Sequence, residues 1–338
     1  MAKRHLTRRQ LWRIKKVQDE RIKRSEARNA TLDQKLEANQ LGPERPGLVI
    51  AHYGMQVEVE ALDGESGGAG FRCHFRTNLE AIVTGDRVIW RAIDEKVGVI
   101  VARSERQSEL ARPDANGLLR PIAANIDQIF IVISTQPLTP LGLIDRYLIA
   151  AESVSIAPLI LANKADLLQG AEKELMQDII KLYESIGYTC ITTSTKSEAG
   201  LTALTQNLTG HTSIFVGQSG VGKSSLVNAI LPDANLRTAT LSHATGKGTH
   251  TTTTAYLYHL PSGGNIIDSP GIREFGLGHI DEQTLAEGFI EFRPYLGHCK
   301  FRDCKHLKEP DCALQQAVAE GRIDPRRMAS FHSIANTV

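Results

Sequence analysis

The spacing of hydrophobic and polar positions changes twice along this 338-residue chain. Residues 1–40 are charged and carry only a weak apolar stripe at helical spacing, which predicts a helical or partly disordered arm. After glycine and proline breaks, residues 47–112 show short alternating apolar runs separated by glycine-rich turns. Several short strands at such close spacing predict a small β-barrel, and an OB-fold is the size that fits. Such a barrel either binds single-stranded nucleic acid or serves only for packing.

Strands and helices alternate from about residue 120 to 278. Residues 129–133 read Ile-Phe-Ile-Val-Ile, a continuous apolar run typical of a buried parallel strand. The other expected elements are strands at 158–162, 190–193, 214–216, 256–260 and 265–268, and helices at 143–154, 171–186 and 223–231. This order predicts a doubly wound α/β domain with a mainly parallel sheet. The tail, about 279–338, holds helical segments and a Cys/His cluster.

Charge is unevenly distributed along the chain. Residues 1–30 hold eleven Lys/Arg and three acids, a net charge of +8, so the remainder carries −7 of the overall +1. A basic arm on an acidic body favours a polyanionic partner such as nucleic acid, and a solvated tail is the alternative. No apolar run is long enough to span a bilayer, and no secretory signal is recognisable. An odd number of cysteines, five, fits a reducing compartment better than a disulfide framework. We therefore expect a cytoplasmic protein, and the lack of a spanning segment predicts no membrane partner.

A phosphate-binding loop follows the strand at 214–216. Its residues are Gly217, Gln218, Ser219, Gly220, Val221, Gly222, Lys223 and Ser224, and Ser225 extends the nucleotide-binding set. The glycines let backbone N–H groups turn toward phosphates, and the following helix adds the positive end of its dipole. Lys223 is expected to reach the β- and γ-phosphates, and the Ser224 hydroxyl to ligate Mg²⁺.

A guanine-reading motif, Asn163-Lys164-Ala165-Asp166, ends the strand at 158–162. Guanine presents an N1–H and a 2-amino group on one edge, and the Asp166 carboxylate can accept both hydrogen bonds. Adenine offers no such pair of donors, so the motif predicts GTP rather than ATP. Asn163 can bridge the base and the phosphate loop. Ser194, after the next strand, is placed to offer a backbone N–H to the guanine carbonyl.

Two further segments are expected on the γ-phosphate side. Asp268-Ser269-Pro270-Gly271 closes the last strand, where Asp268 can hold the Mg²⁺ shell and Gly271 can donate its N–H to the γ-phosphate. Residues 246–254 have the glycines and hydroxyls of a mobile loop, and from it Thr252, with Thr251 as the alternative, can ligate Mg²⁺.

The order of the motifs is unusual, because the base-reading Asp166 precedes the phosphate loop. A doubly wound sheet tolerates such a permutation, since every site loop lies at the carboxyl edge of the strands. Ile272 occupies the position where many small GTPases place a water-orienting glutamine, and isoleucine cannot orient water. His250 is therefore the candidate catalytic group, as water orienter or base. The alternative is that His250 only packs or contacts RNA.

The C-terminal cluster has metal-ligand spacing. Cys299, Cys304, His306 and Cys312 lie within fourteen residues and supply three thiolates and one imidazole. A complete Cys₃His set suits one structural Zn²⁺ and leaves no open coordination position for catalysis. Unrelated buried thiols are the alternative.

Together these motifs resemble the ribosome small subunit-dependent GTPase A family, the circularly permuted GTPases of bacterial small-subunit assembly. The resemblance covers nearly the whole chain: the OB-like region, the permuted order, Gly217–Ser224, Asp268–Gly271 and the Cys/His spacing. It implies a late-acting factor on the 30S subunit that binds 16S rRNA and whose GTP hydrolysis the subunit stimulates. The histidine that precedes a threonine run in the family matches His250. Lys247, Thr249 and the long basic arm depart from the family pattern without touching these roles.

The expected organisation is a basic N-terminal arm at 1–42, an OB-fold-like β-barrel at 43–118, a circularly permuted α/β GTPase domain at 119–278 and an α-helical zinc-binding module at 279–338. We expect a monomer that binds GTP and GDP. Two other classes remain open: a metabolic P-loop kinase, which would have no use for the barrel and zinc module, and a non-catalytic RNA-binding scaffold. Equal competition by ATP and GTP would favour the kinase, and hydrolysis unchanged by small subunits would favour the scaffold.

Overall fold

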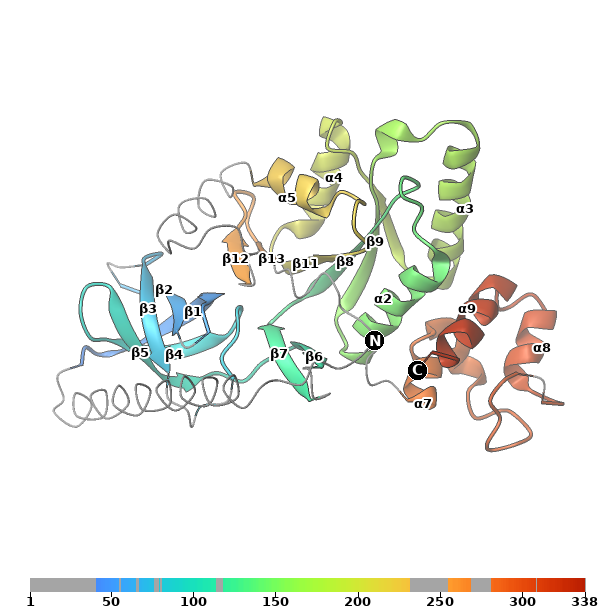
Figure 1. Ribbon diagram of the computed structural model, residues 1–338, viewed down its shortest axis with the longest axis horizontal. Coiled ribbons are helices and arrows are strands. Elements are labelled where there is room, and N and C mark those ends of the chain that lie inside the picture. The colour runs from blue at the N-terminus through green and yellow to red at the C-terminus, as the bar shows by residue number, and fades with distance from the viewer. Residues whose placement is uncertain are drawn as a thin grey trace, which may run out of the picture.

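The computed structural model describes residues 41–54, 56–64, 67–75, 79, 81–113, 118–231, 255–268, 281–307 and 309–337. The predicted arm therefore lies outside the described residues, apart from Leu41 and Gly42. The described chain forms a barrel, an α/β domain and a C-terminal helical module, in that order (Figure 1). No helix among these residues has the length and apolar character needed to cross a membrane.

The N-terminal barrel has five strands in the order β1-β2-β3-β5-β4, closed by pairing of β1 with β4. These strands are β1 (Glu44–His52), β2 (Gln56–Ala61), β3 (Gly70–Phe75), β4 (Arg87–Ala92) and β5 (Val97–Arg103). Trp90 and Val59 fill the core with no exposed surface. Gly47 is needed beside them, because a Cβ there would lie 2.4 Å from Val59 Cγ1. The predicted OB-like barrel is thus confirmed.

A two-stranded hairpin, β6 (Glu109–Pro113) and β7 (Leu119–Ala124), leads from the barrel to the α/β domain. The sequence pattern did not predict these strands, and the expected domain boundary at 118/119 falls inside the hairpin. The isolated bridge between Thr84 and Ala123 ties the hairpin back to the barrel.

The α/β domain is built on a parallel sheet in the order β10-β9-β8-β11-β13, with β12 antiparallel at its edge. The strands are β8 (Gln128–Ile133), β9 (Ala157–Ala162), β10 (Thr189–Thr192), β11 (Thr212–Val216), β12 (Tyr256–His259) and β13 (Asn265–Asp268). The helices are α2 (Leu141–Ser153), α3 (Gly170–Ile186), α4 (Glu198–Leu208) and α5 (Lys223–Ile230), and η1 (Ala165–Leu167) is a short 3₁₀ turn. The predicted doubly wound fold is confirmed, and α4 is an element that the sequence pattern did not predict.

Alternate residues of β8 supply the two faces of this sheet. Ile129, Ile131 and Ile133 belong to the core beneath α2 and α3, whereas Phe130 and Val132 belong to the core beneath α4 and α5. Helices on both faces leave no solvated side for the central strand, which explains its uninterrupted apolar sequence.

The barrel and the α/β sheet form one continuous eleven-stranded sheet through β12 (Figure 1). Ala51 of β1 pairs with Tyr256 of β12, which in turn pairs with Asp268 of β13. A residue of the barrel is therefore two strands away from a predicted site residue.

The C-terminal module comprises α7 (Glu282–Glu287), η3 (Ile290–Tyr295), α8 (Ala313–Ala319) and α9 (Pro325–Ala335). Asp281 and Asp324 cap α7 and α9 by accepting backbone N–H bonds from Thr284 and Arg326. The module packs on α2 through the same hydrophobic core that lies beneath α2 and α3.

A buried ionic cluster joins the C-terminal module to the α/β domain. Arg327 of α9 is 1% exposed and donates to Asp145 of α2 and, over 2.6 Å, to Glu291 of η3. The Tyr183 hydroxyl of α3 donates to the same Asp145 carboxylate over 2.6 Å. The Arg327 guanidinium also lies over the Phe289 ring, 4.4 Å from its centroid. Four elements of two domains therefore meet at one cation.

Candidate functional site

The predicted nucleotide-binding segments meet at one edge of the parallel sheet. Strands β10, β9 and β11 end at this edge and lead into Ser194, Asn163 and Gly217, respectively. Strand β13 ends at the same edge, and its last residue is Asp268. Because the strands are parallel, the order of these segments along the chain does not affect where they lie. The topology thus places the guanine motif beside the phosphate loop despite the permutation.

The phosphate loop connects β11 to the N-terminus of α5, as the sequence predicts. Gly217, Gly220 and Gly222 have φ values of 141°, 84° and 99°, which side-chain-bearing residues rarely adopt. A Cβ on Gly217 would lie 2.4 Å from the Val132 carbonyl oxygen. The Lys223 ammonium donates to the carbonyl oxygens of Gly217 and Gln218 at 2.5 and 2.7 Å, so it lies over the loop. Ser219, Ser224 and Ser225 are exposed, whereas Val221 is buried and anchors the loop.

Two residues of the guanine motif fasten it to the phosphate loop. Asn163 is buried, and its Nδ2 donates to the Val221 carbonyl over 2.8 Å. Lys164 adopts a left-handed conformation, with φ of 62°, and its Nζ donates to the Gly220 carbonyl over 2.8 Å. These bonds hold the base-binding and phosphate-binding halves in a fixed relation. The Asn163 Oδ1 is buried with no partner among the described residues, so a bound donor could satisfy it.

Asp166 is exposed and its carboxylate is held by two neighbours. The Ser194 hydroxyl donates to Oδ1 over 2.5 Å, and Lys196 Nζ lies 3.3 Å from Oδ2. The hydrogen bond from Ser194, aided by Lys196, lowers the pKa of Asp166. The group therefore stays an ionised acceptor at neutral pH, as recognition of two guanine donors requires. The Ser194 side chain thus positions the carboxylate, a role that the sequence did not indicate.

A third wall of the site comes from the loop between β8 and α2, which the sequence did not single out. The Gln136 carbonyl accepts from Lys164 Nζ over 2.5 Å, and the Leu138 carbonyl accepts from Gln218 Nε2 over 3.1 Å. Pro137 lies close enough that a Cβ on Gly220 would be 3.3 Å from its Cδ. These are mainly backbone contacts, so no residue-type pattern marks them. The only available signal was that the loop follows a central strand.

Asp268 lies at the end of β13, next to β11 and its phosphate loop. Asp268 is half-buried, and its position fits an acid that shapes a Mg²⁺ shell, together with Ser224 in the first turn of α5. Gly271, Thr252 and His250 lie outside the described residues. Their predicted roles toward the γ-phosphate, Mg²⁺ and water therefore stay predictions.

The four predicted metal ligands converge, and their ligand atoms all lie within 4.8 Å of one another. His306 Nδ1 is 3.4 to 3.6 Å from the sulfurs of Cys299, Cys304 and Cys312, and the sulfurs of Cys299 and Cys312 are 3.9 Å apart. Tetrahedral Zn–S bonds of about 2.3 Å place sulfurs about 3.8 Å apart. Burial raises the pKa of the Cys304 thiol to about 12, so a cation is needed to stabilise its thiolate. The cluster could hold a metal ion.

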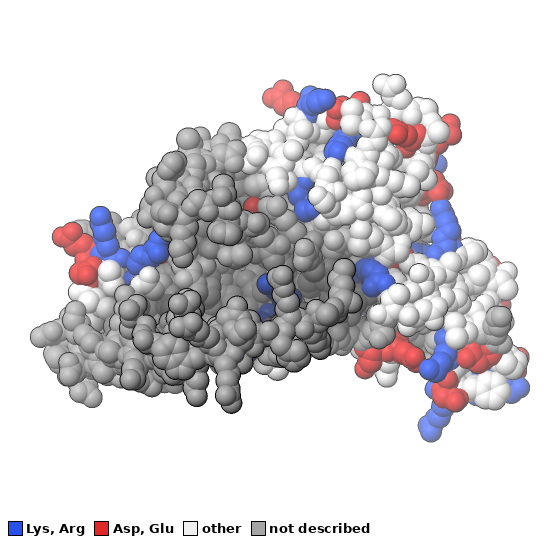
Figure 2. Space-filling model, viewed as in Figure 1, with Lys and Arg blue, Asp and Glu red and all other residues white. Residues whose placement is uncertain are grey.

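Backbone contacts keep His306 in place within this cluster. Its carbonyl accepts from Gln315 Nε2 and from a ring nitrogen of His332, both over 2.8 Å. These bonds stabilise its left-handed backbone, with φ of 61°. Around the cluster, Lys300 pairs with Asp311 and Lys305 with Glu282. Figure 2 accordingly shows basic and acidic side chains side by side over this end of the molecule.

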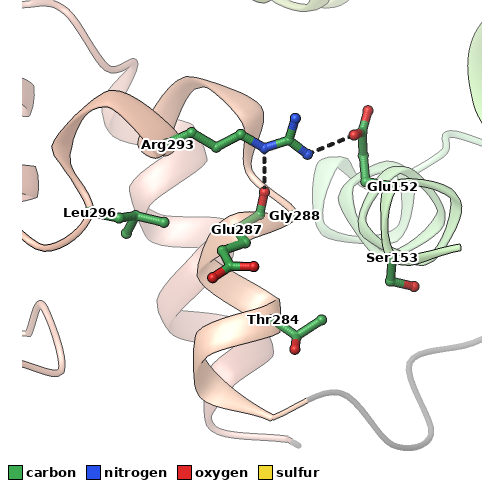
Figure 3. A pocket seen from close by; sticks show the side chains of 7 residues that line it. All are labelled: Glu152, Ser153, Thr284, Glu287, Gly288, Arg293 and Leu296. Carbon is green, nitrogen blue, oxygen red and sulfur yellow. Dashed lines mark hydrogen bonds and ion pairs between the residues drawn. The ribbon is translucent and has the colours of Figure 1, made fainter. Parts of the chain in front are cut away.

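A pocket of about 450 Å³ lies between α2 and the C-terminal module, away from the nucleotide loops (Figure 3). Its lining consists of Glu152, Ser153, Thr284, Glu287, Gly288, Arg293 and Leu296. Arg293 crosses it, pairing with Glu152 over 2.7 Å and donating to the Glu287 carbonyl over 2.8 Å. Because α2 begins at the nucleotide edge and ends here, the pocket belongs to the opposite edge of the sheet. We assign it to domain packing.

Comparisons with known proteins agree over nearly the whole chain. A family model described as RsgA GTPase matches residues 103–278. The small ribosomal subunit biogenesis GTPase RsgA of Pseudomonas aeruginosa is 56% identical over 334 residues, covering 99% of this chain and 97% of that protein. The protein of the same name from Hahella chejuensis is 54% identical over 338 residues, covering 100% of this chain and 97% of that protein.

Two solved structures have the same fold. YjeQ from Thermotoga maritima superposes with a TM-score of 0.71 at 31% identity, covering 87% of this chain and 98% of that one. YloQ, described as a circularly permuted GTPase, gives a TM-score of 0.69 at 31% identity, covering 87% and 95% of the two chains.

Proposed function

The chain belongs to the RsgA GTPase family, and we propose that it hydrolyses GTP to GDP and phosphate during late maturation of the small (30S) ribosomal subunit. The observation that carries the GTP assignment is the ionised Asp166 carboxylate, held by Ser194 and tied through Asn163 to the phosphate loop. Relatives that match nearly the full chain are named for small-subunit biogenesis, which supports the ribosomal assignment. In this role the protein would act in the cytoplasm, as a monomer that binds 16S rRNA.

In this proposal each part of the site has one task. Asp166 accepts the two guanine donors, and Ser194 keeps its carboxylate in place. The backbone of Gly217–Ser225 surrounds the phosphates, and Lys223 moves from the loop carbonyls onto the β- and γ-phosphate oxygens. Gln218 and Lys164 hold the phosphate loop against the β8–α2 loop.

The γ-phosphate side supplies the catalytic groups. Ser224 and Thr252 would ligate Mg²⁺, which neutralises charge that develops on the phosphate oxygens, and Asp268 would orient its shell. Gly271 donates its N–H to the γ-phosphate, and His250 orients the attacking water. Cys299, Cys304, His306 and Cys312 would hold one structural Zn²⁺, which stabilises the fold of the C-terminal module.

Hydrolysis measured with isolated 30S, 50S and 70S particles tests this function. We expect slow GTP hydrolysis by the protein alone and stimulation by 30S particles above the other two. Equal rates with all three particles would contradict the small-subunit assignment, and equal competition by ATP and GTP would contradict the role of Asp166.

The role of His250 needs a separate comparison. His250→Ala should slow hydrolysis while leaving the affinity for GTP near normal. His211→Ala is the matched control, because His211 is exposed and precedes β11 at the opposite edge of the sheet. Loss of GTP binding in His250→Ala would exclude a purely catalytic role.

A further inference from the structure

Among the described strands, β12 is the one that pairs with both the barrel and the α/β sheet. A single row of paired residues crosses the junction: Ala51 in β1, Tyr256 in β12 and Asp268 in β13. Paired strands lie about 4.8 Å apart, so the row spans roughly 10 Å. The position of Asp268 is therefore coupled to the way the barrel holds the start of β12.

Thr84 of the barrel makes the side-chain contact at this point. It has no exposed surface, and its hydroxyl donates over 3.1 Å to the carbonyl of Ala255, the residue before β12. The barrel and the β6–β7 hairpin together fix the donor, because the neighbouring Gly85 N donates to the Val49 carbonyl of β1 and the Thr84 carbonyl accepts from Ala124 N of β7. Ala255 is itself buried, so its carbonyl would be costly to leave without this partner.

The other end of β12 has a different kind of contact with the barrel. A ring nitrogen of His259 lies 2.9 Å from a Glu60 carboxylate oxygen, and the other ring nitrogen lies 2.7 Å from the Asn265 side-chain oxygen. His259 is exposed and pairs with Asn265, at the end of β13 away from Asp268. The two contacts therefore hold opposite ends of one short strand, and the Thr84 contact is the one next to Tyr256, which pairs with Asp268.

We propose that Thr84 is a positioning residue for Asp268: by holding the Ala255 carbonyl, the barrel fixes the β12–β13 hairpin so that the Asp268 carboxylate keeps its place beside the phosphate loop. This inference rests on the proposed role of Asp268 in the Mg²⁺ shell. Mg²⁺ requires nearly ideal octahedral geometry, so a small displacement of that carboxylate is felt as weaker use of the metal. The described residues of the barrel thereby support the geometry of the nucleotide site without lining it.

The test measures GTP hydrolysis as a function of Mg²⁺ concentration for the full-length protein. Thr84→Val keeps the shape of the side chain but removes the donor, and we expect it to raise the half-saturating Mg²⁺ concentration about fivefold to tenfold. Thr84→Ser retains the hydroxyl and should return the value to within about twofold of the unsubstituted protein. If Thr84→Val does not fold, Thr84→Ala removes the same donor and serves for the comparison. Nucleotide affinity in EDTA, which does not depend on the metal shell, should be unchanged.

Two further variants separate positioning from general destabilisation. Glu60→Gln weakens the same barrel–β12 junction at its other end and should leave the Mg²⁺ dependence unchanged. In an Asp268→Asn background, Thr84→Val should add nothing, because the group it positions is already altered. An unchanged Mg²⁺ dependence in Thr84→Val, or a full additional effect in the Asp268→Asn background, would overturn the proposal. Absence of Mg²⁺-dependent hydrolysis in the unsubstituted protein would instead refute the proposed function itself.

Discussion

Replacing Arg327 with methionine should selectively destabilise the C-terminal module. Methionine preserves most of the apolar contact with Phe289 but removes the cation, so Asp145 loses its charged partner in a fully buried position. Removing one member of a buried ion pair costs about 3–5 kcal/mol, because the remaining charge is left uncompensated. The Glu291 side chain is 12% exposed, whereas that of Asp145 is fully buried, so the loss of the charge partner of Glu291 should contribute less to this cost.

Protonation of Asp145 limits the loss and gives it a pH dependence. Burial already raises the pKa of Asp145, and Arg327 opposes that rise. Without the guanidinium the pKa rises further above its unfolded value of about 3.9, so the folded variant binds a proton that the unfolded chain releases. Stability of the variant therefore falls as the pH rises from 5 toward 8, and the destabilisation should be larger at pH 8.

Hydrogen exchange of the α9 amides detects this effect locally, and unfolding in guanidinium chloride gives the loss of global stability for comparison. A loss of 3 kcal/mol corresponds to a more than hundredfold increase in the exchange of amides that open with the module. Arg326→Met is the matched control, since the adjacent arginine is 40% exposed and its pairs with Asp178 and Asp324 are worth about 0–1 kcal/mol. Equal effects of the two substitutions, or a loss below about 1 kcal/mol for Arg327→Met, would refute the reasoning.

Three other substitutions test the nucleotide and metal sites. Gly222→Ala places a Cβ 2.4 Å from Asn163 Nδ2 at a φ of 99°, so GTP affinity in a fluorescence titration should fall at least about tenfold, whereas Gly210→Ala, where φ is 78° but nothing lies near, should not lower it. Asp166→Asn should reduce the preference for GTP over ATP by about 100-fold in competition binding, and retained preference would contradict the base-reading role. Cys304→Ser should lower the metal content found by elemental analysis and expose the C-terminal module to protease, whereas Cys190→Ser, outside the cluster, should retain the metal.

The sequence predicts where the candidate site segments lie wherever their residues are consecutive in the chain. A strand followed by Gly217–Ser224 or by Asn163–Asp166 specifies both a local conformation and the groups that it presents. The parallel sheet then brings these segments together, because the loops that follow its strands all lie at one edge. The same holds for the Cys/His cluster, whose spacing within a short segment is itself a geometric constraint.

Contacts between distant segments could not be predicted in this way. Thr84 and Arg327 are single residues without a motif, and only the folded chain shows that one meets Ala255 and the other Asp145. The β8–α2 loop acts mainly through backbone carbonyls, so its residue types carry little information. Helix α4 escaped prediction because of its modest apolar content, although Leu201, Leu204 and Leu208 have helical spacing.

The shared strand β12 also bears on how the protein is made. During synthesis the barrel strands emerge first, the phosphate loop later, and β12 with β13 only after nearly 80% of the chain, as their place in the sequence implies. Ala51 must therefore wait for a partner about 200 residues further along, a long-range pairing of the kind that slows folding. Until β12 has been synthesised, the edge of β1 at Ala51 has no β12 to pair with, and Asp268 is not yet in place. On the proposed role of Asp268, a nascent chain therefore completes its nucleotide site only after β13 has been synthesised, well after the guanine motif and the phosphate loop.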